Sequence, residues 1–314
     1  MTRRRAVLAA MGFGLCLLVP LVQGTYHLNV LFHVALFAAL GVAWNLVGGY
    51  AGQLSLGHAA FFGIGAYALP LFHDKLGIPI PLTLVLLIVA AVAAAYVIGR
   101  VAFRLRGPYF ALATIAFAEV LRLSAKNLEG VTGGDVGLPV PALFGPTAPI
   151  GWFYVSAVLL TAAAFAATAL IVRSRFGYQL QALREDEDTA RACGIDAARV
   201  KLHAFMISAA FTALGGALYA SQISFIVPDS VLAIDLSERP AIDAMLGGAG
   251  TLTGPIVGAL LLETAQELFK NLFQEAHQLI YGVLLVIVVL FLPEGIVGAI
   301  ARHLRARTRP ASPS

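Results

Sequence analysis

The chain has 314 residues, of which 59% are hydrophobic and only 12% are charged, and its mean hydropathy is +0.85. Soluble domains carry roughly 25% charged residues, so this composition excludes a globular domain surrounded by water. The formal charge of +4 does not indicate nucleic-acid binding, because the arginines lie at the ends of apolar runs. We therefore expect one membrane domain, 1–301, followed by a basic tail, 302–314.

The first apolar run, 6–23, follows Arg3, Arg4 and Arg5 and imitates a secretory signal peptide. It lacks an Ala-x-Ala cleavage site and further apolar runs follow, so we expect an uncleaved first helix. A membrane-spanning helix needs roughly 20 predominantly apolar residues. The candidate spans are 6–23, 28–47, 54–72, 79–98, 108–124, 151–172, 204–221 and 279–292, with a further Gly-rich stretch at 242–262.

Apolar runs such as 81–98 are continuous, whereas the strands of a membrane β-barrel alternate between apolar and polar residues. The predicted fold is therefore an all-α polytopic helical membrane protein with eight to ten spans. The basic residues at the ends of the runs place the two termini and the long loop 173–203 in the cytoplasm. This orientation requires an odd number of crossings over 242–292, so 245–258 is predicted to be a re-entrant or broken helix.

The first interruption of the apolar pattern is 48–58, which is rich in glycine and polar residues but has no charged loop. Its small residues could allow close helix packing. Alternatively, an unwound backbone with Gln53, Ser55 and His58 could line a passage for a polar solute. For His58, a hydrogen-bonded packing role is favoured over direct contact with a solute.

A related pattern occurs at 247–254, and the two segments share a Gly-x-Leu-(Ser or Thr) core. Interrupted helices in two halves of a chain are typical of a transport pathway. The candidate pathway residues in the two segments are Gly52, Gln53, Ser55, Gly57, His58, Gly250, Thr251 and Thr253.

Glu119 is a further pathway candidate, because it is an ionisable residue within an apolar run. Arg122 follows it by three residues, on the same face of a helix. Glu119 therefore either belongs to a solute or proton route or forms an ion pair with Arg122 near the outer interface. The spacing does not decide between these two roles.

The loop 173–203 is the one extended charged segment of the chain. Leu180, Leu183, Ala190 and Cys193 share one face of a predicted helix, which Gly194 ends. Asp196 is the predicted N-cap of a second helix, with Ile195 and Val200 as a hydrophobic staple. Two capped helices with small residues indicate a docking surface rather than a solvated loop.

The motifs of several enzyme classes are missing from the sequence. It contains no P-loop, and its histidines lack the His-x-x-x-His spacing of a metal site. Cys16 and Cys193 lie in separate regions, which argues against a disulfide or a cysteine-based metal site. We expect no catalytic residues, no metal and no cofactor.

Longer motifs extend over roughly residues 28–300. They are 45–67 (NLVGGYAGQLSLGHAAFFGIGAY), 106–112 (RGPYFAL), 116–122 (AFAEVLR), 131–138 and 246–255 (LGGAGTLTGP). On these motifs the chain resembles the permease subunits of ATP-binding-cassette importers for branched-chain amino acids, specifically the M-type member of the permease pair. The run 182–194 is similar to the coupling loop of importer permeases, although Glu187 is followed by Asp188 and Thr189 instead of two alanines.

The resemblance implies a permease that moves leucine, isoleucine or valine across a bacterial inner membrane by alternating access. It implies a homologous second permease, two cytoplasmic ATPases and a periplasmic solute-binding protein as partners, and no nucleic acid. The implied ATPase-coupling residues are Glu187, Ala190, Arg191, Gly194 and Asp196. The alternatives are a related importer for urea or short amides, an ion-coupled secondary transporter, and a structural or receptor-type membrane protein.

Overall fold

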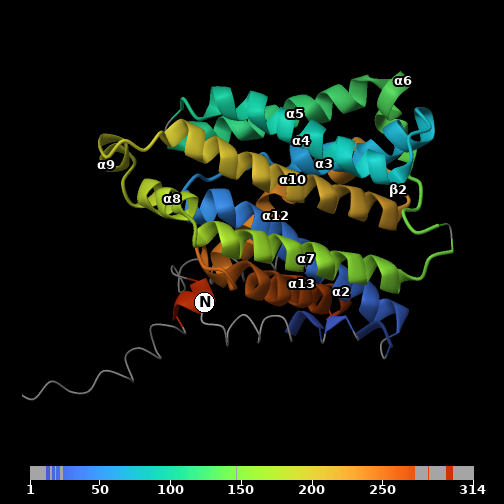
Figure 1. Cartoon of the computed structure of the whole chain (residues 1–314). Helices are drawn as coiled ribbons and strands as arrows, with labels where there is room; N and C mark the ends of the chain where they lie inside the picture. The colour runs from blue at the N-terminus through green and yellow to red at the C-terminus, as the bar shows by residue number, and fades with distance from the viewer. Residues whose placement is uncertain are drawn as a thin grey trace, which may run out of the picture.

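The structure is a computed structural model that describes residues 12–14, 16–17, 19–21, 24–105, 107–145, 147–272, 282 and 295–299. In this part of the chain, long helices lie side by side in an elongated bundle (Figure 1). Its β structure is limited to two short antiparallel strands, β1 (Leu138–Pro139) and β2 (Phe225–Ile226). The predicted all-α class is therefore confirmed.

Five helices among the described residues are long and apolar enough to cross a membrane. They are α2 (Thr25–Asn45) with its π-helical extension η2 (Leu46–Tyr50), α4 (Ile80–Ala102), α5 (Pro108–Asn127), α7 (Ile150–Val172) and α10 (Ala197–Ile223). Each contains all or nearly all of one predicted span. The predicted spans 6–23 and 279–292 lie largely outside the described residues, and η1 (Val19–Leu21) falls within the first.

Three shorter helices complete the bundle. The first is α3 (His58–Ala68), which continues as the π-helix η3 (Leu69–Lys75). The other two are α12 (Asp235–Gly248) and α13 (Gly254–Leu272), near the end of the described chain. The predicted interruption within 245–258 is confirmed, and it takes the form of a corner between α12 and α13. The sequence did not indicate α12 as a separate helix, because its first turns contain Asp235, Glu238, Arg239 and Pro240.

α12 and α13 form a tight antiparallel hairpin, because glycines replace side chains where the two helices meet. A side chain at Gly247 would collide with the backbone of Gly254, and one at Gly258 would collide with the backbone of Asp243. A similar close glycine contact joins α3 to α10, where Gly65 lies against the backbone of Ala213. Small residues at helix contacts are typical of membrane bundles, since they let helix backbones approach closely.

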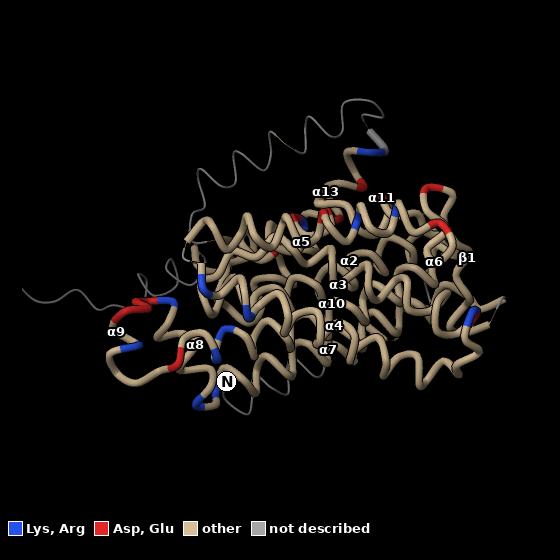
Figure 2. The backbone as a smooth tube through the Cα atoms, turned by 90° about the horizontal axis from the view of Figure 1, so that it is seen from above, with Lys and Arg blue, Asp and Glu red and all other residues tan. Residues whose placement is uncertain are grey.

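The bundle has two distinct ends (Figure 1). One end, the α8–α9 end, contains α8 (Arg175–Glu185) and α9 (Glu187–Ala192). The other, the β1–β2 end, contains the two strands with α6 (Glu129–Thr132), η4 (Gly134–Val136) and α11 (Pro228–Val231). Figure 2 shows charged residues gathered at these ends and also beside α5 and α13.

Candidate functional site

The predicted interruption before α3 is present, since residues 51–57 form no helix. The segment is held against α5 through its backbone: the Leu56 N–H donates to Thr114 Oγ1 at 3.1 Å. At Gly57, a Cβ atom would lie 2.6 Å from the Thr114 carbonyl oxygen, so only glycine fits this approach. Gly52 has a φ of +66°, a left-handed conformation that glycine adopts most easily. Gln53 is partly exposed beside it.

Ser55 and His58 are buried behind this segment. The His58 ring makes hydrogen-bond contacts with Ser55 Oγ at 3.2 Å and Ser208 Oγ at 2.8 Å, so both of its nitrogens have protein partners. The N–H of the next residue, Ala59, donates to Ser237 Oγ at 2.7 Å. These bonds join α3 to α10 and α12 and favour the packing role for His58.

The corner between α12 and α13 is held by the side-chain amide of Asn45, at the end of α2. Asn45 Nδ2 donates to the Thr251 carbonyl, and the Gly250 N–H donates to Asn45 Oδ1, both at 2.8 Å. Thr251 Oγ1 accepts the Gly254 N–H at 3.0 Å and so caps α13. The two Gly-rich segments thus touch, since a Cβ atom on Gly49 would lie 2.5 Å from the Gly250 nitrogen.

Arg184 of α8 lies against both Gly-rich segments. A Cβ atom on Gly52 would be 3.2 Å from Arg184 Cγ, and a side chain at Gly250 would collide with the Arg184 guanidinium group. Gly250 has a φ of +77° and therefore also favours glycine for its backbone. Sequence analysis did not select Arg184, because no local pattern shows that α8 reaches segments more than 60 residues away on either side. Thr253, in the same corner, is exposed.

The predicted helix over 180–193 is wrong in one respect, because Asp186 divides it into α8 and α9. Asp186 has an extended backbone and accepts the Thr189 N–H at 2.6 Å, which makes it the N-cap of α9. This hydrogen bond lowers the pKa of Asp186. The break shifts the helical periodicity, so Ala190 is buried as expected but Cys193 is exposed.

Two predictions at the end of this loop are confirmed: Gly194 ends the short helix α9, and Asp196 is the N-cap of the following helix, α10. Gly194 has a φ of +85°, and the Ile195 N–H donates to the Ala190 carbonyl at 3.1 Å, as in a Schellman motif. Asp196 accepts the Arg199 N–H at 3.0 Å, which makes it the N-cap of α10. α10 therefore begins at 197, directly after its predicted N-cap, and contains the predicted span 204–221.

Glu187 ties α9 to α10. Its carboxylate accepts hydrogen bonds from Arg191 Nη2 at 2.6 Å, within α9, and from Lys201 Nζ at 2.5 Å, in α10. Lys201 is 4% exposed in its side chain, so it is a buried cation with a carboxylate partner. The α8–α9 end is therefore a packed unit and not a loose loop.

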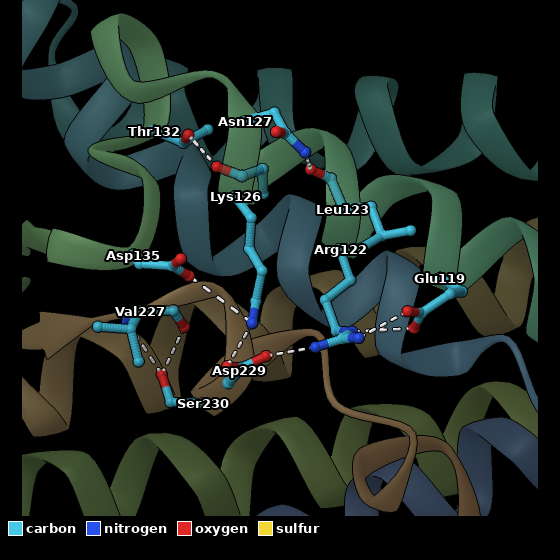
Figure 3. A network of polar contacts seen from close by, with 11 residues as sticks. Glu119, Arg122, Leu123, Lys126, Asn127, Thr132, Asp135, Val227, Asp229 and Ser230 are labelled. Atoms are coloured by element: carbon cyan, nitrogen blue, oxygen red, sulfur yellow. Dashed lines mark hydrogen bonds and ion pairs between the residues drawn. The ribbon is translucent and has the colours of Figure 1, made fainter.

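Glu119 forms the expected ion pair with Arg122, and the pair is part of a larger network (Figure 3). Arg122 Nε and Nη2 donate to the two carboxylate oxygens of Glu119 at 2.8 and 2.6 Å. Arg122 also bonds Asp229 of α11 at 2.5 Å, and Lys126 bonds the other oxygen of Asp229 at 2.6 Å. Lys126 lies 3.6 Å from Asp135 of η4.

This network holds α5, α11 and η4 together at the β1–β2 end. The hydrogen bond from the Lys126 ammonium group is the largest cause of the lowered pKa of Asp229. The Arg122 guanidinium group lowers this pKa further. The Glu119 side chain is 46% exposed, so the pair is not deeply buried. Asp229 was not a candidate in the sequence, because it lies 107 residues from Arg122.

The described residues contain no group of three or more metal-binding side chains. Two helices that begin after interruptions, a spanning bundle and a packed unit at one end together define a multi-pass membrane protein of the transporter class. The chain belongs to the family described as "Branched-chain amino acid transport system / permease component", whose model matches residues 26–289.

Curated relatives agree with this assignment. The chain is 31% identical to the high-affinity branched-chain amino acid transport system permease protein LivM of Escherichia coli K12, over 92% of this chain and 73% of that protein. It is 28% identical to LivH of the same organism, over 83% and 91% of the two chains. A probable LivM of Methanocaldococcus jannaschii is 24% identical over 68% of each chain. No solved structure matches the chain.

Proposed function

We propose that this chain is the M-type permease subunit of an importer that moves branched-chain amino acids across the inner membrane. Its family and the printed names of its relatives support this substrate class. The observation that carries the mechanism is the contact of Arg184 with both Gly-rich segments. Through it, the α8–α9 end is linked to the places where two helices are interrupted.

In this mechanism, separate ATPase subunits dock on α8 and α9 in the coupling loop 173–203. The proposed ATPase-coupling residues on this surface are Glu187, Ala190, Arg191, Gly194 and Asp196. Because the unit is tied to α10 by Glu187 and Lys201, we expect it to move as one body when the ATPases close. Its Arg184 then displaces the turns at Gly52 and Gly250, where glycine allows the backbone to change conformation.

The pathway is proposed to run beside these two turns. Gly52, Gln53 and Thr253 are the accessible candidates, whereas Ser55 and His58 lie behind them and set the position of α3. Gly57 acts through its close backbone approach to Thr114, and Thr251 acts through its carbonyl and hydroxyl groups. Glu119 is proposed to stabilise the β1–β2 end rather than to contact solute, because both of its oxygens are bonded to Arg122.

The proposed complex contains a LivH-like second permease, two ATPases and a periplasmic binding protein. On the positive-inside rule, the α8–α9 end and both termini are proposed to lie in the cytoplasm. The domain is proposed to cover 1–301, with the basic tail 302–314. ATP hydrolysis would take place in the partner subunits, so this chain acts as a permease and not as an enzyme.

The test is leucine uptake by the purified complex in proteoliposomes, with urea as the competing solute. Arg184→Ala should retain bound ATPases and lose most of the uptake. Arg104→Ala is the matched control, because Arg104 is an exposed arginine outside the docking loop, and this variant should transport normally. Uptake of urea alone, or ion-driven uptake by the single chain, would refute the proposed function. Normal uptake by Arg184→Ala would refute the coupling route.

A further inference from the structure

A cavity of about 460 Å³ lies between α2, α12 and α13, away from the turns described above. Sites for small molecules usually have volumes of roughly 300–1,000 Å³. Its lining includes Arg239 from α12, Glu263 from α13, and Asn29 and Val30 from α2. Charged side chains are costly in membrane helices and usually mark a functional site or an ion pair.

Glu263 has no ion pair to explain its burial. The residue is 9% exposed, and within the described residues its carboxylate has neither a hydrogen bond nor a basic partner. Glu267, one turn further along α13, differs because it accepts a hydrogen bond from the Tyr26 hydroxyl at 2.6 Å. The Glu263 carboxylate therefore lines the cavity without a direct cationic partner, and a cation bound there would stabilise its ionised form.

Arg239 is the complementary group on the opposite wall. Its guanidinium lies 5.4 Å from the centre of the Phe37 ring, which is a cation–π contact, and no carboxylate of the described part of the chain pairs with it. Asp243, on the next turn of α12, is buried as well, and its Oδ2 has no hydrogen-bond partner among the described residues. The cavity therefore presents a cation and an anion that form no direct ion pair with each other, and its lining also contains Glu267 and Lys270.

We propose that this cavity binds the charged groups of the transported amino acid, with its α-carboxylate at Arg239 and its α-ammonium at Glu263. A guanidinium can donate two parallel hydrogen bonds to a carboxylate, and a buried carboxylate is neutralised by an ammonium group. The inference rests on the proposed function, because it assigns a substrate contact to the same transporter. It concerns the zwitterionic part shared by amino acids and so separates them from urea, which lacks both charges.

A double-mutant cycle in the reconstituted complex tests the proposal. Glu263→Gln and Arg239→Gln should each raise the leucine concentration for half-maximal uptake about tenfold or more, because each removes a charge-assisted hydrogen bond. The double variant should be impaired at least as much as either single variant. Glu238→Gln, which removes a charge beside Arg239 but outside the cavity lining, is the matched control and should transport normally.

Recovery of uptake in the double variant would overturn the proposal, because it would show that the two groups pair only with each other. Unchanged uptake in both single variants would also overturn it. Failure of the wild-type complex to transport leucine would instead reject the proposed function, and the substrate assignment with it. The two failures are therefore distinguishable.

Labelling of a cysteine at Val30 gives a second measurement that needs no charge variant. Val30→Cys is placed in a complex with Cys16→Ser and Cys193→Ser, and a charged maleimide is added during turnover. Leucine should slow the labelling severalfold, whereas urea should not. Equal labelling rates with and without leucine would overturn the proposed site even if the charge variants failed to assemble.

Discussion

Asn45 joins the end of α2 to the corner between α12 and α13, and its replacement by leucine should uncouple these elements. The side chain is 1% exposed and makes two hydrogen bonds of 2.8 Å to backbone groups of Gly250 and Thr251. Leucine has a similar volume, so the substitution removes the two bonds without leaving a large cavity. Any loss of stability then reports on the backbone groups that remain without partners.

The expected magnitude follows from those two groups. A buried donor or acceptor that loses its partner costs about 1–3 kcal/mol. Because the corner is only partly buried, water reaches some of these atoms, and we expect a combined loss near the lower end of the range, about 2–4 kcal/mol. The free energy of unfolding in mixed micelles measures this loss. Asn45→Leu should also reduce leucine uptake, since the corner no longer holds its position beside Arg184.

Asn127→Ala is the matched control for this experiment. Its amide also donates to a backbone carbonyl, that of Leu123 at 2.7 Å, but at an exposed position on α5. Water can replace that bond, so the control should change the unfolding free energy by less than about 0.5 kcal/mol. Wild-type stability and uptake in Asn45→Leu would refute the argument that this amide connects the two Gly-rich segments.

Three further predictions concern the two ends of the bundle. Gly194→Pro should release the ATPases or abolish uptake while the bundle stays folded, because proline cannot adopt a φ of +85°; normal ATPase recovery and uptake would contradict the docking role. Glu119→Gln should leave the amount of folded complex near wild type, since the Glu119 side chain is 46% exposed. Arg122→Gln should lower that amount, because it also releases Asp229; a lower yield of folded complex for Glu119→Gln than for Arg122→Gln in gel filtration would contradict the network. The lowered pKa of Asp229 stabilises the fold above the pKa of about 3.9 expected in the unfolded chain, and that contribution is lost as the pH falls further. The melting temperature of the wild type should therefore fall as the pH is lowered below about 4, and that of Asp229→Asn should fall by less. Equal pH profiles of the two melting temperatures would reject this assignment.

Local features of the sequence determined much of the fold. The apolar runs predicted the spanning helices, since in lipid the backbone must satisfy its own hydrogen bonds. The cap at Asp196 and the helix end at Gly194 were also predicted, because both depend on residues three or four positions away. The interruptions at 48–58 and within 245–258 could be recognised from glycine and polar residues in otherwise apolar surroundings.

The division at Asp186 was missed even though it is local. The helical face through Leu180, Leu183, Ala190 and Cys193 was a plausible continuous pattern, and an aspartate can occupy either a helix or its cap. The choice became clear only when Asp186 was seen to accept the Thr189 N–H. α12 was missed for a different reason, because its charged first turn lowers the hydropathy of a helix that is nevertheless buried.

The contacts on which the proposals rest were decided by tertiary structure alone. Asn45 meets Gly250 across 205 residues, and Arg122 meets Asp229 across 107. Arg239 and Glu263 line one cavity only because α12 and α13 fold back as a hairpin against α2. Composition and periodicity determine whether a segment becomes a helix and which residues it can bury. They do not determine which helix faces come together, because that depends on packing between segments that are distant in the chain.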